Sequence, residues 1–208
     1  MGKNQSTKLT YDTIADEFSA SRAYIWPDIK PYLDQVQAGA SVLDLGCGNG
    51  RILNGLPNDI NYLGIDQSEN LLEKAKLAHP NKNFLVADIT EQKTWRNLLT
   101  YDFIFCIAVI HHLSTYHEHM FLLEQIKKHL NPGGKVLITA WNLWQPKLLK
   151  HHLDIKTKLT NHHHVFIPFQ GHPRFHFAHT GPYLKKLVEK SHLDLVVEKT
   201  KRNYLIHS

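Results

Sequence analysis

The stretch "VLDLGCGNG", from Val42 to Gly50, decides the fold class of this chain. It begins as an apolar run and continues past Asp44 into glycines at alternate positions, Gly46, Gly48 and Gly50. This pattern predicts a buried β-strand followed by a tight turn, because glycine lets the backbone bend sharply and approach a ligand closely. The turn is therefore the first candidate for a cofactor site.

The size and composition of the chain predict one domain, residues 1–208. Hydrophobic residues make up 42% and charged residues 21% of the sequence, as in ordinary soluble proteins. The polar start "MGKNQSTKLT" is no signal peptide, and no apolar run approaches the roughly 20 residues that cross a bilayer. Cys47 and Cys106 are isolated within apolar stretches, which favours reduced cysteines and a cytoplasmic protein. The net charge of +5 permits an anionic partner such as RNA without requiring one.

Strand and helix signals alternate along the middle of the chain. Helical spacing of apolar residues runs from Thr115 to Leu130, with a capping box of Thr115 and Glu118 at its start, and a second helix runs from Ser68 to about His79. Near-continuous apolar runs suit strands that are buried on both faces of a parallel sheet. These runs are "SVLDLG", "NYLGID", "NFLVAD", "DFIFCIAVI" and "GKVLITAW". The alternation predicts an α/β fold with a doubly wound sheet.

Two segments stand outside this alternation. The first is an N-terminal arm, residues 1–39, which precedes the predicted cofactor-binding core of residues 41–141. The second is an insertion, residues 142–180, which is rich in histidine, proline and aromatic residues and is expected to form a lid. Residues 181–208 then predict a closing helix and two closing strands.

The ends of the predicted strands carry the polar residues that a ligand would need, because ligands of doubly wound sheets bind beyond the carboxyl ends of the strands. Asp66 follows the second strand, twenty positions after Gly46, and can bind both hydroxyls of a ribose. Asp88 follows the third strand, where an adenine amino group would need an acceptor. The fourth strand ends at His111 and His112, and the fifth at Trp141 and Asn142.

The glycine spacing distinguishes between two adenosine cofactors. A dinucleotide-binding turn reads G-x-G-x-x-G and holds a pyrophosphate, whereas this turn reads G-x-G-x-G behind the carboxylate of Asp44. A carboxylate there repels a pyrophosphate but helps to order a cationic amino-acid end. The sequence therefore favours S-adenosylmethionine, which carries an adenosine, an ammonium and a sulfonium but no phosphate.

The motifs "VLDLGCGNGR", "GID", "VAD" and "LNPGGKVLI" resemble the class I S-adenosylmethionine-dependent methyltransferases, from Ser41 to about Trp141. The resemblance implies a seven-stranded, mostly parallel sheet of the Rossmann-like kind, with the last strand antiparallel. It further implies that the first glycines and Asn49 line the methionine end, that Asp66 holds the ribose and that Asp88 and Ile89 meet the adenine. The full expected set of cofactor-binding residues is Asp44, Gly46, Cys47, Gly48, Asn49, Gly50, Asp66, Gln67, Asp88, Ile89, Ala108 and Trp26.

A narrower resemblance concerns the methyl acceptor. "YDTIADEFSASRAYIWPDIKPYL", "AVIHHLST", "HVFIPF", "RFHF" and "RNYLI" are similar to motifs of the tRNA wobble-uridine methyltransferases, which esterify 5-carboxymethyluridine. That resemblance implies tRNA as a partner, together with a small zinc-binding activating protein. Two alternatives stay open: a methyltransferase for small molecules with a closed pocket, and a non-catalytic scaffold that binds S-adenosylmethionine.

Four residues are candidates for catalysis. Arg22 and Arg174 can grip a carboxylate by two hydrogen bonds, and a carboxylate nucleophile needs no base. A hydroxyl or amine nucleophile would need a general base, which His111 or His112 could supply. Each arginine could instead be solvated at the surface, and one histidine of the pair could be structural. Trp26 could likewise anchor the arm in the core or form an aromatic wall near the cofactor, and the same two alternatives are open for Tyr11.

Sixteen histidines raise the question of a metal, but the sequence has no HExxH motif and no cysteine near them at a zinc spacing, so no metal site is expected. The run from His162 to His164 is expected at the surface. A possible phosphate-contacting face consists of Lys147, Lys150, Lys156 and Lys158.

Overall fold

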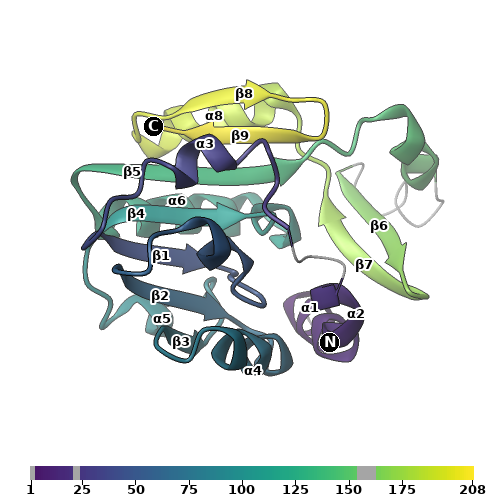
Figure 1. Ribbon diagram of the computed structural model, residues 1–208. Helices are drawn as coiled ribbons and strands as arrows, with labels where there is room; N and C mark the ends of the chain where they lie inside the picture. Colours follow the sequence, from purple (N-terminus) through teal and green to yellow (C-terminus); the bar gives the residue numbers. More distant parts are fainter. Residues whose placement is uncertain (1–2, 21–23, 154–162) are drawn as a thin grey trace.

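The computed structural model of the chain describes residues 3–20, 24–153 and 163–208 (Figure 1). Within them, seven strands form one sheet in the order β3-β2-β1-β4-β5-β9-β8. The strands are β1 (Ser41–Leu45), β2 (Asn61–Asp66), β3 (Asn83–Val86), β4 (Tyr101–Ile107), β5 (Leu130–Trp141), β8 (Val196–Lys199) and β9 (Asn203–His207). The first five pair in parallel and β9 is antiparallel to β5 and β8, so the predicted doubly wound, mostly parallel sheet is confirmed.

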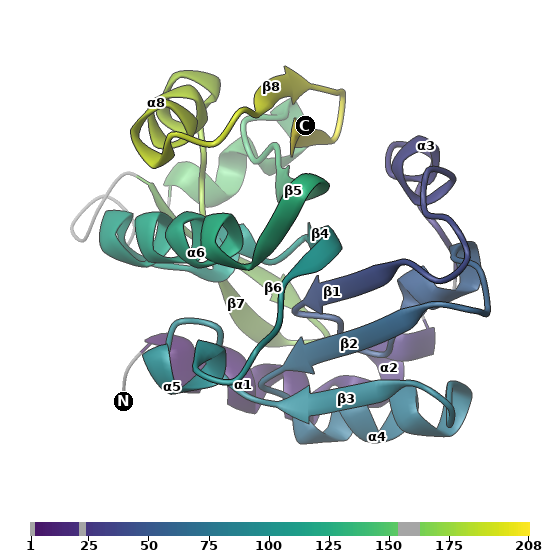
Figure 2. The same cartoon turned by 90° about the vertical axis from the view of Figure 1, so that its left-hand side faces the viewer.

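Helices and shorter helical turns cover both faces of this sheet, with α6 and α8 on one side and α3 on the other (Figure 2). The α-helices are α1 (Lys3–Thr13), α2 (Ala15–Ala20), α3 (Lys30–Leu33), α4 (Glu69–Ala78), α5 (Gln92–Trp95), α6 (Tyr116–His129) and α8 (Gly181–Ser191). The 3-10 turns are η1 (Arg51–Gly55), η2 (Ile110–His112) and η3 (Pro146–Leu153). No helix in the described ranges is long and apolar enough to cross a membrane.

Strand β4 shows why the apolar runs lack the alternation of a half-exposed strand. Ile104 and Cys106 belong to the hydrophobic cluster under α6 and α8, whereas Phe105 and Ile107 belong to the cluster under α3 and η1. Because successive side chains of a strand point to opposite faces, a strand covered on both faces must be apolar at every position.

Both predicted helices are capped at their starts, and the capping box of Thr115 and Glu118 forms as the sequence indicates. At the start of α6, the Thr115 hydroxyl accepts a hydrogen bond from the Glu118 amide, and the Glu118 carboxylate accepts one from the Thr115 amide. Ser68 caps α4 by accepting from the amide of Leu71. Each cap satisfies backbone donors that have no partner inside the helix.

The first part of the arm and the insertion lie at the carboxyl edge of the parallel strands (Figure 1). The described part of the arm forms α1 and α2 at this edge, where α1 contacts both α4 and β7, and then α3, which packs on a face of the sheet (Figure 2). The described part of the insertion forms η3 and a separate hairpin of β6 (His164–Phe169) and β7 (His172–Phe177). Both segments therefore border the edge where ligands of this fold class bind.

Candidate active site

A cavity opens at the carboxyl edge of the sheet and has an empty volume of about 980 Å³. One of its walls comes from the turns after β1, β2 and β3, and we call this wall the glycine side. The opposite wall, the histidine side, comes from α1, the ends of β4 and β5, and β7. Its residues are Tyr11, His111, His112, Trp141 and Arg174.

The turn after β1 has glycines where other residues would not fit. Gly46 has a φ of +70°, and a Cβ there would lie 2.2 Å from a methyl carbon of Val109. Gly48 has a φ of +55°, and its amide donates a 2.8 Å hydrogen bond to Oδ2 of Asp66. The glycines thus bring the backbone of β1 close to the carboxylate that follows β2.

Two carboxylates of the glycine side are held by backbone amides. Asp66 also accepts through Oδ1 from the amide of Ser68 at 2.9 Å, and burial raises its pKa although these amide bonds oppose the rise. Asp88 accepts through Oδ1 from the amide and hydroxyl of Thr90, at 2.8 and 2.7 Å. Both carboxylates are fixed in orientation before any ligand binds, which lowers the cost of ligand recognition.

Ten of the twelve expected cofactor residues line this cavity: Gly46, Cys47, Gly48, Asn49, Asp66, Gln67, Asp88, Ile89, Ala108 and Trp26. The structure places the other two behind the lining. Asp44 is buried, accepts a 2.8 Å hydrogen bond from the hydroxyl of Tyr62, and has its pKa raised to about 7 by that burial. Gly50 caps η1 with a φ of +74°. Asp44 and Gly50 therefore support the turn from behind the cavity lining and do not contact the cavity directly.

Ala108 adopts a backbone conformation that is unusual for a residue with a side chain. Its φ is +61°, and its amide donates a 2.8 Å hydrogen bond to the hydroxyl of Thr139. Non-glycine residues in this region are strained and cluster at ligand sites, where the surrounding structure maintains them. The strain at the end of β4 supports the expectation that this backbone faces a ligand.

The two histidines after β4 are held in different ways. The backbone amide of Trp141 donates a 3.4 Å hydrogen bond to Nδ1 of His111, which is 1% exposed. His112 contacts the carbonyl of Phe175 through Nδ1 and the hydroxyl of Tyr11 through Nε2, both at 2.9 Å. Burial lowers the pKa of His112 to about 4 and that of His111 further below its usual range. Both rings are therefore neutral at pH 7.

Arg174 is the cation of the histidine side. Its guanidinium stacks on Phe169 and Trp141, with its central carbon 4.8 and 5.7 Å from the ring centroids, and Nη1 donates to the hydroxyl of Tyr11 at 3.4 Å. The residue is only 5% exposed. Among the described residues, no carboxylate pairs with it, and its buried Nε has no hydrogen-bond partner.

A group of three histidines, His111, His112 and His176, brings one ring nitrogen from each residue within 4.8 Å of the others. A metal ion would require the three lone pairs to converge on one point. The rings of His111 and His176 instead stack at an interplanar angle of 13°, so their lone pairs lie in nearly parallel planes. The neighbouring Arg174 also opposes a cation. This geometry favours packed neutral rings over a metal site.

Several residues that the sequence analysis singled out lie away from the cavity or outside the described residues. Arg22, Lys156, Lys158 and His162 fall outside the described residues, whereas Lys147 and Lys150 are exposed on η3. The surface prediction is wrong for His164, which is buried and contacts the carbonyl of Ser114. His163 is half-buried and stacks on Phe177 at an angle of 4°. The hairpin packs against η2 through β7, which brings its first residues toward the domain.

The sequence left Tyr11 open between a core anchor and a wall of the site and did not assign Arg51 or Trp141, although all three line the cavity. The Arg51 guanidinium lies 4.1 Å from the centroid of the Trp26 ring, which also packs against the core cluster under α3. Trp26 therefore serves both of its alternative roles, as core anchor and as cavity wall. Two of the three offered a signal in the sequence, Tyr11 as an aromatic residue of the arm and Trp141 by its position at a strand end.

The glycine side fits S-adenosylmethionine by the chemistry of its groups. Asp66 offers the carboxylate that a ribose needs, Asp88 offers an acceptor for an adenine, and the open backbone at Gly48 and Asn49 faces the same cavity.

Comparisons with known proteins agree with this fit. The chain is 37% identical over 135 residues to the tRNA (carboxymethyluridine(34)-5-O)-methyltransferase of Saccharomyces cerevisiae, covering 65% of this chain and 47% of that protein. The Arabidopsis thaliana protein of the same name is 37% identical over 131 residues, covering 63% and 31%. The chain thus spans half or less of the length of these relatives.

A solved S-adenosylmethionine-dependent methyltransferase from Methanosarcina mazei has a similar fold. Its TM-score is 0.71 at 17% identity, and the match covers 88% of this chain and 96% of that one. The family model described as a methyltransferase domain matches residues 18–198. The chain therefore belongs to the methyltransferase-domain family, as a class I domain that uses S-adenosylmethionine.

Proposed function

We propose that this chain transfers a methyl group from S-adenosylmethionine to the carboxylate of 5-carboxymethyluridine at the wobble position of tRNA, forming a methyl ester. The observation that carries the carboxylate acceptor is the buried guanidinium of Arg174, which pairs with no described carboxylate. A buried cation costs free energy until an anion and hydrogen bonds satisfy it. An acceptor carboxylate would supply both.

The histidines of the site support the same acceptor. His112 has a pKa of about 4 and that of His111 is also far below its usual range, so neither is matched to general-base catalysis near pH 7. A carboxylate has a reference pKa near 4 and is already ionised. Bound S-adenosylmethionine supplies an electrophilic methyl group, and its transfer to a carboxylate oxygen requires no deprotonation.

The residues of the histidine side would then bind and orient the acceptor instead of activating it. Arg174 would hold the carboxylate by charge-assisted hydrogen bonds, and the rings of Trp141 and Phe169 keep water away from the guanidinium. Alignment of reacting groups can supply about 7–11 kcal/mol of a reaction barrier. The glycine side would hold the cofactor through Asp66 and Asp88.

The assignment of tRNA as the acceptor comes from the relatives. Two of them, from yeast and Arabidopsis, carry the name of a tRNA carboxymethyluridine methyltransferase at 37% identity. The net charge of +5 and the exposed Lys147 and Lys150 at the carboxyl edge of the sheet suit a polyanion. An unpaired wobble base could stack on an aromatic side chain such as Trp141.

Two further parts of the proposal concern an activating protein and the location of the enzyme in the cell. The wobble-uridine methyltransferases that this chain resembles work with a small zinc-binding protein, and we propose that this chain uses a similar activator. We also propose a cytoplasmic location. Cys47 and Cys106 are both free and buried, which suits a reducing compartment.

A methyl-transfer assay tests the proposed function. The purified protein is incubated with labelled S-adenosylmethionine and tRNA that carries unesterified 5-carboxymethyluridine, and the nucleosides are then analysed by mass spectrometry. We expect the methyl ester at the wobble position, and none with tRNA that carries unmodified uridine there. The Arg174→Ala variant is the matched control for the acceptor site.

Other outcomes favour the alternatives. If cofactor binds but no tRNA is methylated, even with the zinc-binding activator present, the tRNA assignment is wrong. Transfer to small carboxylic acids in that case would favour a small-molecule methyltransferase. Tight cofactor binding without transfer to any acceptor would favour a scaffold.

A further inference from the structure

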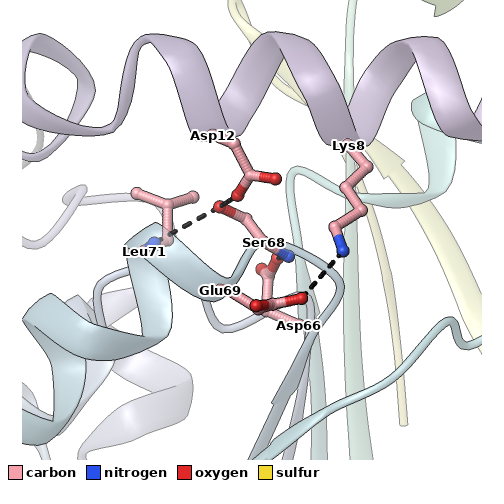
Figure 3. A network of polar contacts seen from close by, with 6 residues as sticks. All are labelled: Lys8, Asp12, Asp66, Ser68, Glu69 and Leu71. Carbon is pink, nitrogen blue, oxygen red and sulfur yellow. Dashed lines mark hydrogen bonds and ion pairs between the residues drawn. The ribbon is translucent and has the colours of Figure 1, made fainter.

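The N-terminal helix α1 is docked on the turn that carries Asp66 (Figure 3). Oδ1 of Asp12 accepts a 2.6 Å hydrogen bond from the hydroxyl of Ser68, and its backbone carbonyl accepts one from the side chain of Asn70 at 2.9 Å. An ion pair of Lys8 and Glu69, 3.0 Å long, lies beside this contact. The ion pair is exposed and contributes little, so the half-buried Asp12 contact carries most of the specificity of docking.

Ser68 joins this docking contact to the cofactor site. Its amide donates to Oδ1 of Asp66, and its hydroxyl oxygen also accepts from the amide of Leu71 at the start of α4. The other carboxylate oxygen of Asp66 accepts from Gly48. A correctly formed ribose-binding turn is therefore the surface on which Asp12 docks.

The residue before Asp12 in α1 reaches the opposite wall of the cavity. The hydroxyl of Tyr11 lies 2.9 Å from Nε2 of His112 and 3.4 Å from Nη1 of Arg174. Adjacent residues of an α-helix point about 100° apart, because 3.6 residues make one turn. Neighbouring side chains of α1 thus reach both walls: Asp12 contacts the segment that carries Asp66, and Tyr11 contacts the histidine side.

The direction of these hydrogen bonds is fixed by their partners. The carbonyl of Phe175 can only accept, so Nδ1 of His112 carries the proton, and Nε2 of the neutral ring is left as an acceptor. The hydroxyl of Tyr11 must then donate to His112. Its oxygen lone pair is left to accept from Arg174, whose guanidinium has no acceptor group of its own.

We propose that Tyr11 is a positioning residue for the methyl acceptor. Its hydroxyl orients the Arg174 guanidinium toward the acceptor carboxylate, and Asp12 holds Tyr11 in place by docking on the Asp66 turn. This inference rests on the proposed function, since it concerns how the same carboxylate is recognised. It also couples the two walls of the cavity: a formed cofactor turn is needed for a correctly placed Arg174.

The Tyr11→Phe variant tests the role of the hydroxyl, because it keeps the ring and the docking of α1. We expect kcat/KM for tRNA with 5-carboxymethyluridine to fall about tenfold, the usual scale for a lost hydrogen bond to a charged group, with unchanged affinity for S-adenosylhomocysteine. Tyr24→Phe is the matched control, because Tyr24 is 56% exposed and outside the cavity lining. We expect it to behave as wild type.

A double-mutant cycle separates positioning from packing. If Tyr11 acts through Arg174, Tyr11→Phe should cost less than about twofold in an Arg174→Lys background, because coupled residues do not add. Asp12→Ala should reproduce the loss seen for Tyr11→Phe, and Asp12→Asn, which keeps the acceptor for Ser68, should restore most of the activity. Additive effects in the cycle would overturn the proposal.

A measurement without RNA keeps this inference separate from the proposed function. The ¹⁵N signal of Nε2 of His112 should shift in Tyr11→Phe and stay unchanged in Tyr24→Phe, because only the first variant removes its donor. If wild type and Tyr11→Phe esterify the tRNA equally well, the role of Tyr11 is wrong and the proposed function stands. If wild type esterifies no tRNA even with the activator present, the proposed function fails, and an unshifted Nε2 signal would overturn the Tyr11 contact as well.

Discussion

The two walls of the cavity are built in different ways. The glycine side comes from three successive strand–turn units, and its groups are backbone amides and the carboxylates of Asp66 and Asp88. The histidine side joins segments far apart in the sequence: Tyr11 contacts His112 across 101 positions and Arg174 across 163. A wall of local turns can be recognised from a short motif, whereas a wall assembled by tertiary packing cannot.

The walls also differ in charge. Acidic groups gather on the glycine side, and the histidine side has the buried cation Arg174 among neutral imidazoles. On the proposed function, the acidic wall receives the ribose and amino groups of the cofactor and the basic wall receives the acceptor carboxylate. A change on the histidine side should then leave cofactor binding intact, whereas a change in the Asp66 turn should also reach Arg174 through α1.

Replacement of Asp66 should have the largest effect, and the effect should appear first in cofactor binding. Asp66→Ala removes the ribose partner and the acceptor for the amides of Gly48 and Ser68. We expect S-adenosylhomocysteine binding, measured by calorimetry, to weaken by at least about 100-fold, or about 3 kcal/mol. The exposed Asp59 provides the control, Asp59→Ala, which should bind as wild type. Unchanged affinity in Asp66→Ala would remove Asp66 from the cofactor site.

Replacement of Arg174 should damage only the histidine side. Arg174→Ala should lower kcat/KM for tRNA carrying 5-carboxymethyluridine by about 100-fold, because the acceptor carboxylate loses its charged partner. Affinity for S-adenosylhomocysteine should stay within about twofold of wild type. Arg96→Ala, at an exposed position, serves as the control. Full activity in Arg174→Ala would contradict the carboxylate role.

Acidification should destabilise the folded protein, because its buried histidines are neutral in the native state. The pKa of His119 falls to about 4 on burial, so the unfolded chain binds more protons than the native one between about pH 6.5 and 4. The free energy of unfolding should therefore decrease as pH falls through that window, by up to about 3 kcal/mol from His119 alone. Urea denaturation at several pH values measures this slope.

Two variants locate the source of that slope. His119→Gln should flatten it, and His117→Gln, at an exposed position on the same helix, should leave it unchanged. An equal slope in wild type and His119→Gln would show that the buried ring of His119 does not titrate as its surroundings indicate.

The fold could be predicted from the sequence because its signals are local. The apolar runs mark strands that are covered on both faces, and the capping box of Thr115 and Glu118 marks the start of α6 to within one residue. The turn residues of the glycine side follow directly from strand ends. These features depend on neighbours in the chain, so no tertiary contact was needed to find them.

The histidine side was predicted only in part: the sequence named His111, His112 and Arg174, but not the contacts that join them to α1. The helix α1 is mostly polar, "KNQSTKLTYDT", and nothing in that pattern shows that Tyr11 points into a cavity. The buried His119 contacts Tyr183 and His179, at separations of 64 and 60 positions. A histidine pattern in the sequence is the same whether the ring is solvated or packed against a distant partner.

Charge reversal on η3 should have the smallest of these effects. Lys147→Glu with Lys150→Glu should weaken tRNA binding by a few fold and reduce its dependence on salt, since each phosphate contact contributes about one unit of salt slope. Lys76→Glu with Lys128→Glu, at exposed positions on α4 and α6, is the charge-matched control. An equal loss in both pairs would show that net charge, not this face, attracts the RNA.

The central claim is that the histidine side recognises a carboxylate. The most direct test is calorimetric binding of two anticodon stem-loops to the complex with S-adenosylhomocysteine, one with 5-carboxymethyluridine and one with its neutral carboxamide at the same position. We predict that the carboxylate binds at least about tenfold more tightly, as a charge-assisted bond requires, and that Arg174→Ala removes this preference. Equal affinities for the two stem-loops in the wild-type protein would contradict the account.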